Sequence, residues 1–385
     1  MIGAVAFVAV PGAAVAGAQT VVEEGDTVVM VAPAGGLSPS NDYANAIAMP
    51  LPQAAVVSPS RIVEATAPAD PRTLFGEPGS AAGGAGTGVK TPVRVAPPAA
   101  PTGDAAEADG TAQPAESGTF HRPFTTNRVD PLGDVITDSY PFRAAGRIFF
   151  RANGFTYVCS GALIKPGIVV TAAHCVAEFG RRVFYSGIEF IPAYRNGLAP
   201  YGVWKAARAR VRRSYFDGSA ACSPDAPGVV CRNDIAVIRL QSQNGAYPGV
   251  VTGWFGYGWN GYGFTPAGIT QITQLGYPVA LDDGKLMQRT DSQGTVAPEL
   301  AGNTLIGSLM SGGSSGGPWV LNLGIAPQLT GTLFGAAAAR NIIVGVTSWG
   351  YLSYLPKEQG ASPFTGDNIV PMVDAECQAT PAACS

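Results

Sequence analysis

The sequence predicts an all-β fold for residues 129–385 of this 385-residue chain. Glycine and proline together supply 82 residues (50 plus 32), and this share favours many turns over long helices. Short runs of β-branched and aromatic residues alternate with turn residues here, as is typical of a β-sandwich or a β-barrel. The clearest expected strands cover residues 147–150, 168–171, 234–240, 268–272 and 342–346.

Two helical features are expected within this β pattern. A turn follows His174, and a short helix covers residues 369–376 near the C-terminus. All six cysteines and all five tryptophans lie after residue 128, so this part of the chain holds the material for a hydrophobic core.

The N-terminal third has a different composition. Residues 1–18 are apolar and end in Ala-Gly-Ala, a sequence typical of a signal-peptidase site, so we interpret them as a signal peptide. A start codon assigned too late and an alanine-rich tail are the alternatives. Residues 19–128 are rich in Pro, Ala and Gly and sustain no helical period, which predicts a mostly disordered pro-segment or linker. Within it, 21–22 and 27–31 could form isolated strands.

Composition argues against several classes of function. Only 13% of the residues are charged and the formal net charge is −3, so no broad basic field is present to bind nucleic acid. The apolar N-terminal run is short and contains Pro11, which argues against a stable membrane span. His121 and His174 are the only histidines, so sites that need a histidine cluster are excluded, and no metal or other cofactor is expected.

Three segments carry the residues of a nucleophilic active site. His174 lies in Thr-Ala-Ala-His-Cys after an apolar run, Asp234 opens an expected strand, and Ser315 lies in the glycine-rich residues 312–318. A serine hydroxyl is a weak nucleophile at neutral pH and needs a base within hydrogen-bonding distance, which an imidazole supplies. A buried carboxylate then fixes the tautomer of the imidazole and stabilises its protonated form.

The chain resembles the trypsin/chymotrypsin-like serine peptidases at all three segments and in their order along the sequence. The resemblance implies two six-stranded antiparallel β-barrels with a short C-terminal helix, preceded here by the low-complexity N-terminal region. It also implies that His174 is the base, Asp234 its orienting carboxylate and Ser315 the nucleophile. The backbone N–H groups of Gly313 and Ser315 would form the oxyanion hole.

Cysteine spacing favours disulfides over a metal site. The six cysteines form three local pairs without a C-x-x-C motif, although six cysteines allow 15 connectivities. The family resemblance supports one pairing, Cys159 with Cys175. Disulfides are typical of exported proteins, so we expect a secreted or periplasmic protein. The other two local pairs are Cys222 with Cys231 and Cys377 with Cys384.

The residues expected to contact substrate depart from well-known branches of the family. Ser348, Trp349 and Gly350 resemble the strand that pairs with the substrate backbone, whose serine usually hydrogen-bonds the catalytic carboxylate. In several short sequence motifs the chain resembles the bacterial secreted branch of the family, which includes the glutamyl endopeptidases. Leu309 replaces the aspartate of trypsin-like pockets, and Thr347 replaces the histidine of the glutamyl endopeptidases. We therefore expect a small or apolar residue before the scissile bond.

Ser314 also departs from the family pattern. In trypsin-type zymogens the aspartate at this position pairs with a newly formed N-terminus, so a zymogen of this chain requires another activation mechanism. Arg128, Arg143 and Arg147 are candidate processing points between the N-terminal region and the peptidase domain.

Other motifs give weaker signals. Residues 313–317 match the GxSxG elbow of α/β-hydrolases, but in that fold the histidine follows the serine. Residues 256–261 match GxGxxG without a surrounding βαβ unit. The arginines at 208, 210 and 212 share one face of a strand and are interpreted as an exposed, charged edge.

The sequence therefore predicts a monomeric secreted serine endopeptidase that acts on proteins or peptides through an acyl-enzyme intermediate. The alternative is a peptidase-like binding protein that has kept the fold but has weak or no turnover.

Overall fold

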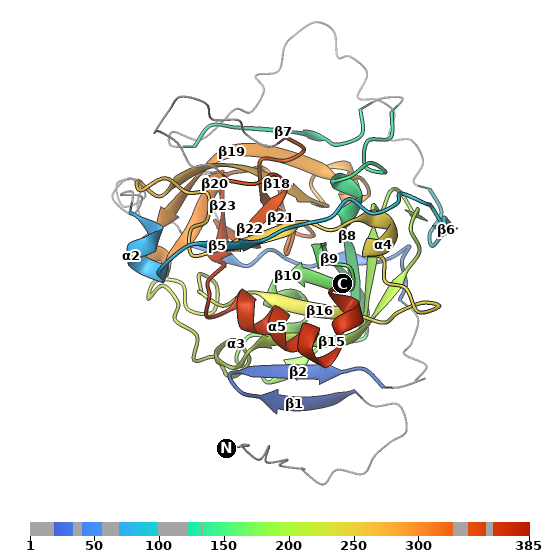
Figure 1. Ribbon diagram of the computed structural model, residues 1–385, viewed down its shortest axis with the longest axis horizontal. Helices are drawn as coiled ribbons and strands as arrows, with labels where there is room; N and C mark the ends of the chain where they lie inside the picture. The colour runs from blue at the N-terminus through green and yellow to red at the C-terminus, as the bar shows by residue number, and fades with distance from the viewer. Residues whose placement is uncertain are drawn as a thin grey trace, which may run out of the picture.

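The computed structural model describes most of the chain (Figure 1). The expected signal peptide and His121 lie outside the described residues. The described ranges are 19–33, 41–55, 69–98, 122–131, 134–325, 338–351 and 357–385.

The first barrel contains six antiparallel strands that close on themselves. Strand β10 is buried along its whole length, which explains why its sequence is a continuous, mostly apolar run. Leu163, Val169 and Ile238 belong to the hydrophobic cluster that fills this barrel. In sheet order the strands are β8 (Ala145–Ala152), β9 (Phe155–Lys165), β10 (Ile168–Thr171), β16 (Ala236–Leu240), β15 (Trp204–Arg212) and β13 (Ser186–Pro192), which pairs again with β8.

The second barrel also closes with six antiparallel strands, drawn in orange above the green first barrel in Figure 1. Ile272, Ile306 and Trp319 are buried in one of its clusters. In sheet order the strands are β18 (Ile269–Gly276), β19 (Gln288–Ala297), β20 (Asn303–Gly307), β23 (Glu358–Pro363), β22 (Ile342–Tyr351) and β21 (Pro318–Leu321), which pairs again with β18.

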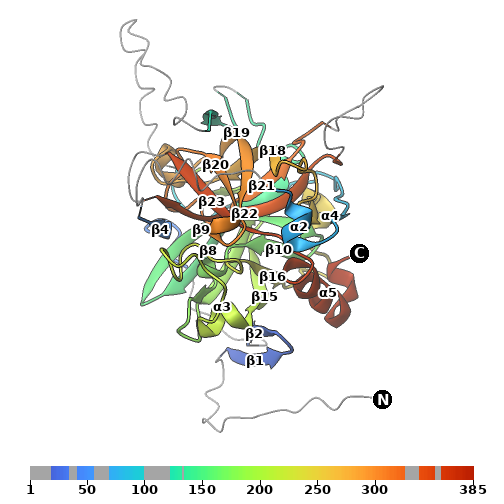
Figure 2. The ribbon, with the colours of Figure 1, turned by 90° about the vertical axis from the view of Figure 1, so that its left-hand side faces the viewer.

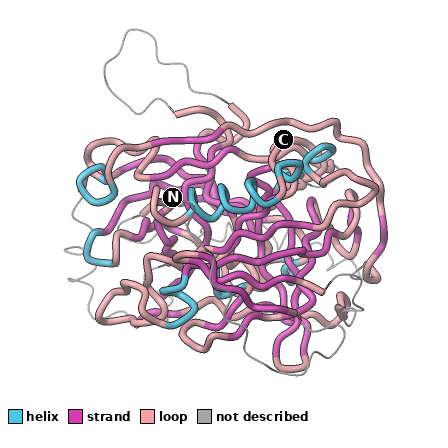
Figure 3. Tube along the Cα trace, turned by 60° about the horizontal axis from the view of Figure 1, so that its bottom comes forward, coloured by secondary structure: helices cyan, strands magenta, loops and turns pink. Residues whose placement is uncertain are grey.

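Helices are few and short, as the small number of cyan segments in Figure 3 shows. The longest described helix, α5 (Ile369–Ala379), lies against β16 and includes the helix expected at 369–376. The prediction of two six-stranded antiparallel barrels with a C-terminal helix is confirmed. The remaining helical turns are η1 (Phe142–Ala144), η2 (Ala173–Cys175), α3 (Arg213–Asp217), α4 (Gly249–Thr252), η3 (Asp282–Gly284), η4 (Pro298–Leu300) and η5 (Pro381–Ala383).

Short strands lie outside the two barrels in residues 129–385. β17 (Gly256–Trp259) runs parallel to β22, which places the GxGxxG match in a strand rather than in a strand-to-helix turn. The others are β11 (Ala177–Glu178), β12 (Val183–Phe184) and β14 (Leu198–Ala199). Among the described residues, no helix has the length and apolar character needed to cross a membrane.

Several parts of residues 19–128 form regular structure. The hairpin of β1 (Thr20–Glu24) and β2 (Thr27–Val31) pairs through β2 with β15 and lies below the first barrel in Figure 1. Among the described residues, β1 pairs only with β2, and every other strand of this region forms backbone hydrogen bonds with a strand of residues 129–385. The other elements are β3 (Ile47–Ala48), β4 (Gln53–Ala54), α2 (Pro71–Phe75), β5 (Gly79–Ala81), β6 (Val93–Arg94) and β7 (Phe124–Arg128).

Arg208 and Arg210 of β15 belong to a buried ion-pair network, whereas Arg212 lies 3.7 Å from the exposed Asp26. Arg210 is 1% exposed and lies 2.7 Å from Glu376, which is fully buried in α5. Arg208 and Arg239 lie 3.2 and 3.1 Å from the same carboxylate. Glu24 of β1 adds contacts of 2.6 Å to both Arg208 and Arg210. The interpretation as an exposed edge is wrong because β2 pairs with β15 there.

Candidate active site

Strand pairing brings His174 beside Asp234. β10 pairs antiparallel with β16 with Thr171 opposite Ala236, so the residues after β10 and those before β16 lie at the same end of the first barrel. His174 Nδ1 lies 2.7 Å from Asp234 Oδ2, and the His174 backbone N–H donates to Asp234 Oδ1 at 2.9 Å. An ionised carboxylate in this position favours the tautomer that carries hydrogen on Nδ1 and leaves Nε2 as the base.

The surroundings of Asp234 keep it ionised. Ser348 Oγ donates to Oδ2 at 2.6 Å, the hydrogen bond that the family resemblance leads us to expect. Burial by itself raises the pKa of Asp234. The electrostatic attraction between Asp234 and His174 and the hydrogen bonds from His174 and Ser348 outweigh the effect of burial and hold the pKa of Asp234 below its ordinary value. The backbone N–H of Asp234 also donates to Ser362 Oγ at 3.2 Å.

The turn that carries Ser315 packs against the first barrel. Gly316 has a φ of +78°, and a Cβ there would lie 1.9 Å from Thr171 Oγ1, so the turn requires glycine. The carbonyl of Ser315 accepts a hydrogen bond from the Ser160 N–H at 2.7 Å. These contacts bring the turn to the end of β10, next to the segment that carries His174.

Local hydrogen bonds stabilise the turn at the position where the family has aspartate. Ser314 is fully buried. Its N–H and its Oγ both donate to the carbonyl of Ser311, at 3.1 and 2.7 Å. The replacement of aspartate by Ser314 is therefore compatible with an ordered turn before Ser315.

The two atoms that would exchange a proton are shielded from solvent. Ser315 is fully buried and His174 is 7% exposed. Ser315 Oγ and His174 Nε2 have no hydrogen-bond partner within the part of the chain that the structure describes. The Gly313 N–H, one of the two expected oxyanion donors, donates to the carbonyl of Met49 at 3.0 Å. A residue of the N-terminal region thus lies at the expected oxyanion hole.

A polar network that the sequence did not reveal lies beside the expected substrate strand. Gln274, fully buried, donates through Nε2 to Thr347 Oγ1 at 2.7 Å and to Gln359 Oε1 at 2.6 Å. Ser308 Oγ donates to Gln274 Oε1 at 2.7 Å. Leu309 is half-buried next to this network. Gln274 could have been suspected only from its place in β18, because a buried glutamine in a strand requires partners.

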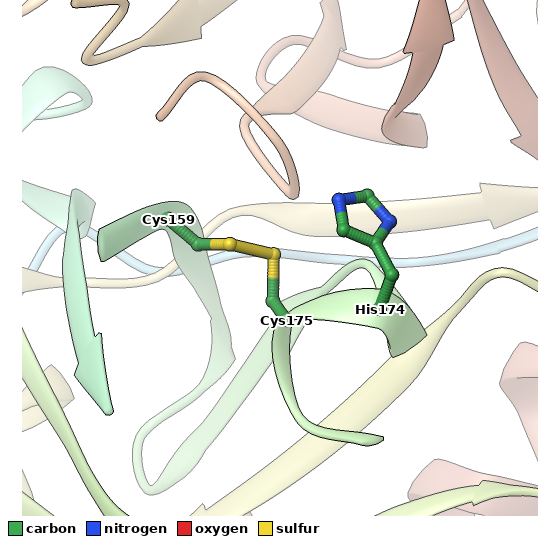
Figure 4. A group of neighbouring side chains, drawn as sticks. All are labelled: Cys159, His174 and Cys175. Carbon is green, nitrogen blue, oxygen red and sulfur yellow. A yellow bond between two sulfur atoms is a disulfide. The ribbon is translucent and has the colours of Figure 1, made fainter. Parts of the chain in front are cut away.

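Three disulfides connect the cysteines in the local pairs seen in the sequence. Figure 4 shows His174 next to the bridge of Cys159 and Cys175. The sulfur atoms and a ring nitrogen of His174 lie within 4.8 Å of one another. The two sulfurs are bonded to each other, so they are not thiolate ligands for a metal. The other bridges join Cys222 to Cys231 and Cys377 to Cys384.

The three candidate processing points differ in accessibility. Arg147 is 5% exposed, and its guanidinium lies over the rings of Phe149 and Tyr194. Arg143 is half-buried and donates to the carbonyls of two other segments. Arg128 is exposed at the end of β7. Of the three, Arg128 is the residue that a protease could reach in the folded chain.

The chain belongs to the Trypsin family, which it matches over residues 137–365. This range contains His174, Asp234 and Ser315, together with all strands of the two barrels.

Known relatives are similar over part of the chain. It is 28% identical over 123 residues to the extracellular metalloprotease of Bacillus subtilis (strain 168), covering 31% of this chain and 34% of that protein. It is 26% identical over 125 residues to the human chymotrypsin-like elastase family member 3B, covering 30% and 38%. The chain therefore spans little more than a third of the length of these curated relatives.

Solved structures of bacterial proteases are also similar. Protease Anisep from Arthrobacter nicotinovorans is 27% identical, with 63% of this chain and 96% of that chain covered and a TM-score of 0.44. A Glu endopeptidase is 18% identical, with 65% and 95% covered and a TM-score of 0.44.

Proposed function

We propose that the protein is a secreted serine endopeptidase that hydrolyses peptide bonds through Ser315, His174 and Asp234. The observation that carries the proposal is the pair of hydrogen bonds by which the buried Asp234 holds His174 in a member of the Trypsin family. A secreted or periplasmic location is part of the proposal, because three disulfides are typical of an oxidising compartment.

Each residue has a defined part in the proposed reaction. Ser315 Oγ attacks the peptide carbonyl carbon while His174 Nε2 accepts the hydroxyl proton. The ionised Asp234 stabilises the resulting imidazolium, and the N–H groups of Gly313 and Ser315 stabilise the oxyanion. His174 then gives its proton to the leaving nitrogen as the C–N bond breaks. Water attacks the acyl-enzyme by the same sequence and releases the carboxylic acid and the free serine.

The substrate class follows from the uncharged residues near the expected specificity pocket. Leu309, Thr347, Gln274 and Gln359 are neutral, and the amides of the two glutamines are hydrogen-bonded to each other. A neutral pocket does not compensate the desolvation of a charged side chain. We therefore expect cleavage after a small or apolar residue, and slower cleavage after Lys, Arg or Glu.

Labelling with a fluorophosphonate probe tests the proposal. The probe is applied to the full-length chain and to the chain from which residues 19–128 have been removed by limited proteolysis. We expect one adduct in the trimmed chain, mapped to Ser315, and hydrolysis of a peptide library by the same sample. The Ser315→Ala variant should show neither, with an unchanged circular dichroism spectrum. If Ser315 is labelled in neither the full-length nor the trimmed chain, the result would instead support a peptidase-like binding protein.

A further inference from the structure

One part of the N-terminal region lies directly at the proposed active site. Residues 47–54, here named the crossing segment, pass from the first barrel to the second. The segment begins as β3, which runs parallel to β9, and ends as β4, which runs parallel to β22. Figure 2 shows β4 at the level where the orange and green barrels meet.

Backbone hydrogen bonds attach the crossing segment to both barrels. The Met49 N–H donates to the Val158 carbonyl in β9 at 2.9 Å, and the Met49 carbonyl accepts from the Gly313 N–H at 3.0 Å. Further along, the Pro52 carbonyl accepts from the Gly350 N–H in β22 at 2.9 Å. A proposed oxyanion donor and the expected substrate strand are therefore both occupied by the chain itself.

The residues before the crossing segment hold it on the first barrel. Asn41 Nδ2 donates to Glu189 Oε2 and to the Gly187 carbonyl, each at 2.8 Å. The Tyr43 hydroxyl donates to the same Glu189 oxygen, and its ring packs edge-on against Phe149 with centroids 5.0 Å apart. Asn41 and Glu189 are both buried, so these hydrogen bonds are shielded from water.

The crossing segment runs in the direction opposite to a productive substrate. The leaving nitrogen of a substrate has to reach His174 in the first barrel, while its acyl part pairs with β22 in the second. A substrate therefore runs from the second barrel to the first. The crossing segment runs from the first barrel to the second, so the nitrogen of its Met49–Pro50 bond lies on the side away from His174.

We infer that the crossing segment is an intramolecular inhibitor that keeps the peptidase latent. The segment accepts the hydrogen bond of the Gly313 N–H and pairs with β22, the expected substrate strand, in the orientation opposite to that of a substrate. This orientation protects the segment from cleavage. The inhibitory role rests on the proposed peptidase function. The segment lies beside the turn before Ser315, with the Met49 carbonyl oxygen 2.9 Å from the position that a Cβ on Gly312 would take, and Ser315 is fully buried.

Two neighbouring alanines provide a matched pair of variants in the full-length chain. Ala54 is 4% exposed and packs in the cluster of Trp349, whereas Ala55 is exposed. Ala54→Asp puts an unpaired carboxylate into this apolar contact, so we expect it to displace the segment. Fluorophosphonate labelling of Ser315 should then accelerate by about tenfold or more. Ala55→Asp adds the same charge at the surface and should leave labelling at the wild-type rate.

A second variant decides the outcome if Ala54→Asp fails to fold. Asn41→Ala removes two hydrogen bonds without adding bulk, and it should accelerate labelling by a smaller factor. Full-length wild type that labels as fast as both variants and as the trimmed chain would overturn the inhibitory role. If Ser315 stays unlabelled in every form, including the trimmed chain, the peptidase function itself is refuted.

Intact-mass measurement tests the reversed orientation. We expect the Met49–Pro50 bond to stay intact in the full-length chain during the labelling experiment. A fragment beginning at Pro50 that forms at a rate independent of protein concentration would mean that the segment is bound as a substrate, which overturns the reversed orientation. The Ser315→Ala chain is the control for cleavage by contaminating proteases.

Discussion

Asp234 is the residue on which the proposed site depends most directly. It accepts hydrogen bonds from the ring and the backbone of His174 and from Ser348, and it is 3% exposed. A buried carboxylate with these partners orients the imidazole and favours its protonated form. The identities of these three residues were predictable from the sequence because each lies in a short, recognisable string.

Asp234→Asn should lower kcat on a peptide substrate by about 10⁴-fold, because the amide favours the wrong tautomer of His174. The measurement is made on the trimmed chain, with Asp283→Asn as control, since the Asp283 side chain is 61% exposed and Asp283 is no part of the proposed site. A loss of less than about tenfold would contradict the orienting role of Asp234.

Ser348→Ala should change the pH at which the protein loses stability on acidification. Because the folded-state pKa of Asp234 is lowered, its ionised form stabilises the protein above the unfolded-state pKa. This contribution is lost as the pH falls through the folded-state pKa. Without the Ser348 hydrogen bond the folded-state pKa rises, so the loss begins at a higher pH. Thermal unfolding between about pH 2 and pH 6 measures the shift. A curve displaced equally at all pH values would contradict this explanation.

At the scale of single elements, the short strands of the N-terminal region were the hardest to foresee. Residues 27–31 were predictable as a strand from their β-branched residues, but their partner was not. β2 pairs with β15, which lies about 180 residues further along the chain. Local patterns indicate whether a segment can be a strand, whereas the choice of partner depends on distant contacts. The same reason applies to β3 and β4.

The ion-pair network between α5 and the first barrel gives a prediction on the free energy of unfolding. Glu376→Gln removes the charge that faces Arg208, Arg210 and Arg239, so it should lower the free energy of unfolding by about 3–5 kcal/mol. Glu178→Gln is the control, because Glu178 and its partner Arg181 have side chains 54% and 74% exposed. An exposed pair contributes at most about 1 kcal/mol. Urea unfolding measures both variants, and equal losses would contradict a buried network.

At the scale of the whole molecule, the two-barrel architecture was predictable through the family resemblance, while the position of the N-terminal region was not. The strings around His174, Asp234 and Ser348 led us to expect that these three side chains lie together, and they are joined by hydrogen bonds. The strings carried no information on the chain segment that lies at Gly313, because residues 47–54 have no distinctive composition. The polar network of Gln274 was missed for a related reason, since a single glutamine in a strand gives no signal without its partners.

The disulfides give a prediction on global stability. Replacing both Cys159 and Cys175 by alanine removes a disulfide between residues 16 apart in the sequence, which should lower the free energy of unfolding by about 3 kcal/mol. Replacing both Cys377 and Cys384 by alanine removes a disulfide between residues 7 apart and should lower the free energy of unfolding by about 2.4 kcal/mol. Calorimetry of the two double variants measures both losses. A larger loss at the C-terminal bridge would contradict the expected order.

The N-terminal region contacts both barrels at several points along its length. β2 and β3 pair with strands of the first barrel, β4 with the second, β6 with β14, and β7 again with the second. Cutting the chain at one point, for example after Arg128, leaves every one of these pairings in place. A nicked fragment stays at a high effective concentration and rebinds faster than it escapes. If the crossing segment inhibits the peptidase as proposed, we expect activation to require the loss of several of these attachments, and single cuts to leave the protein latent.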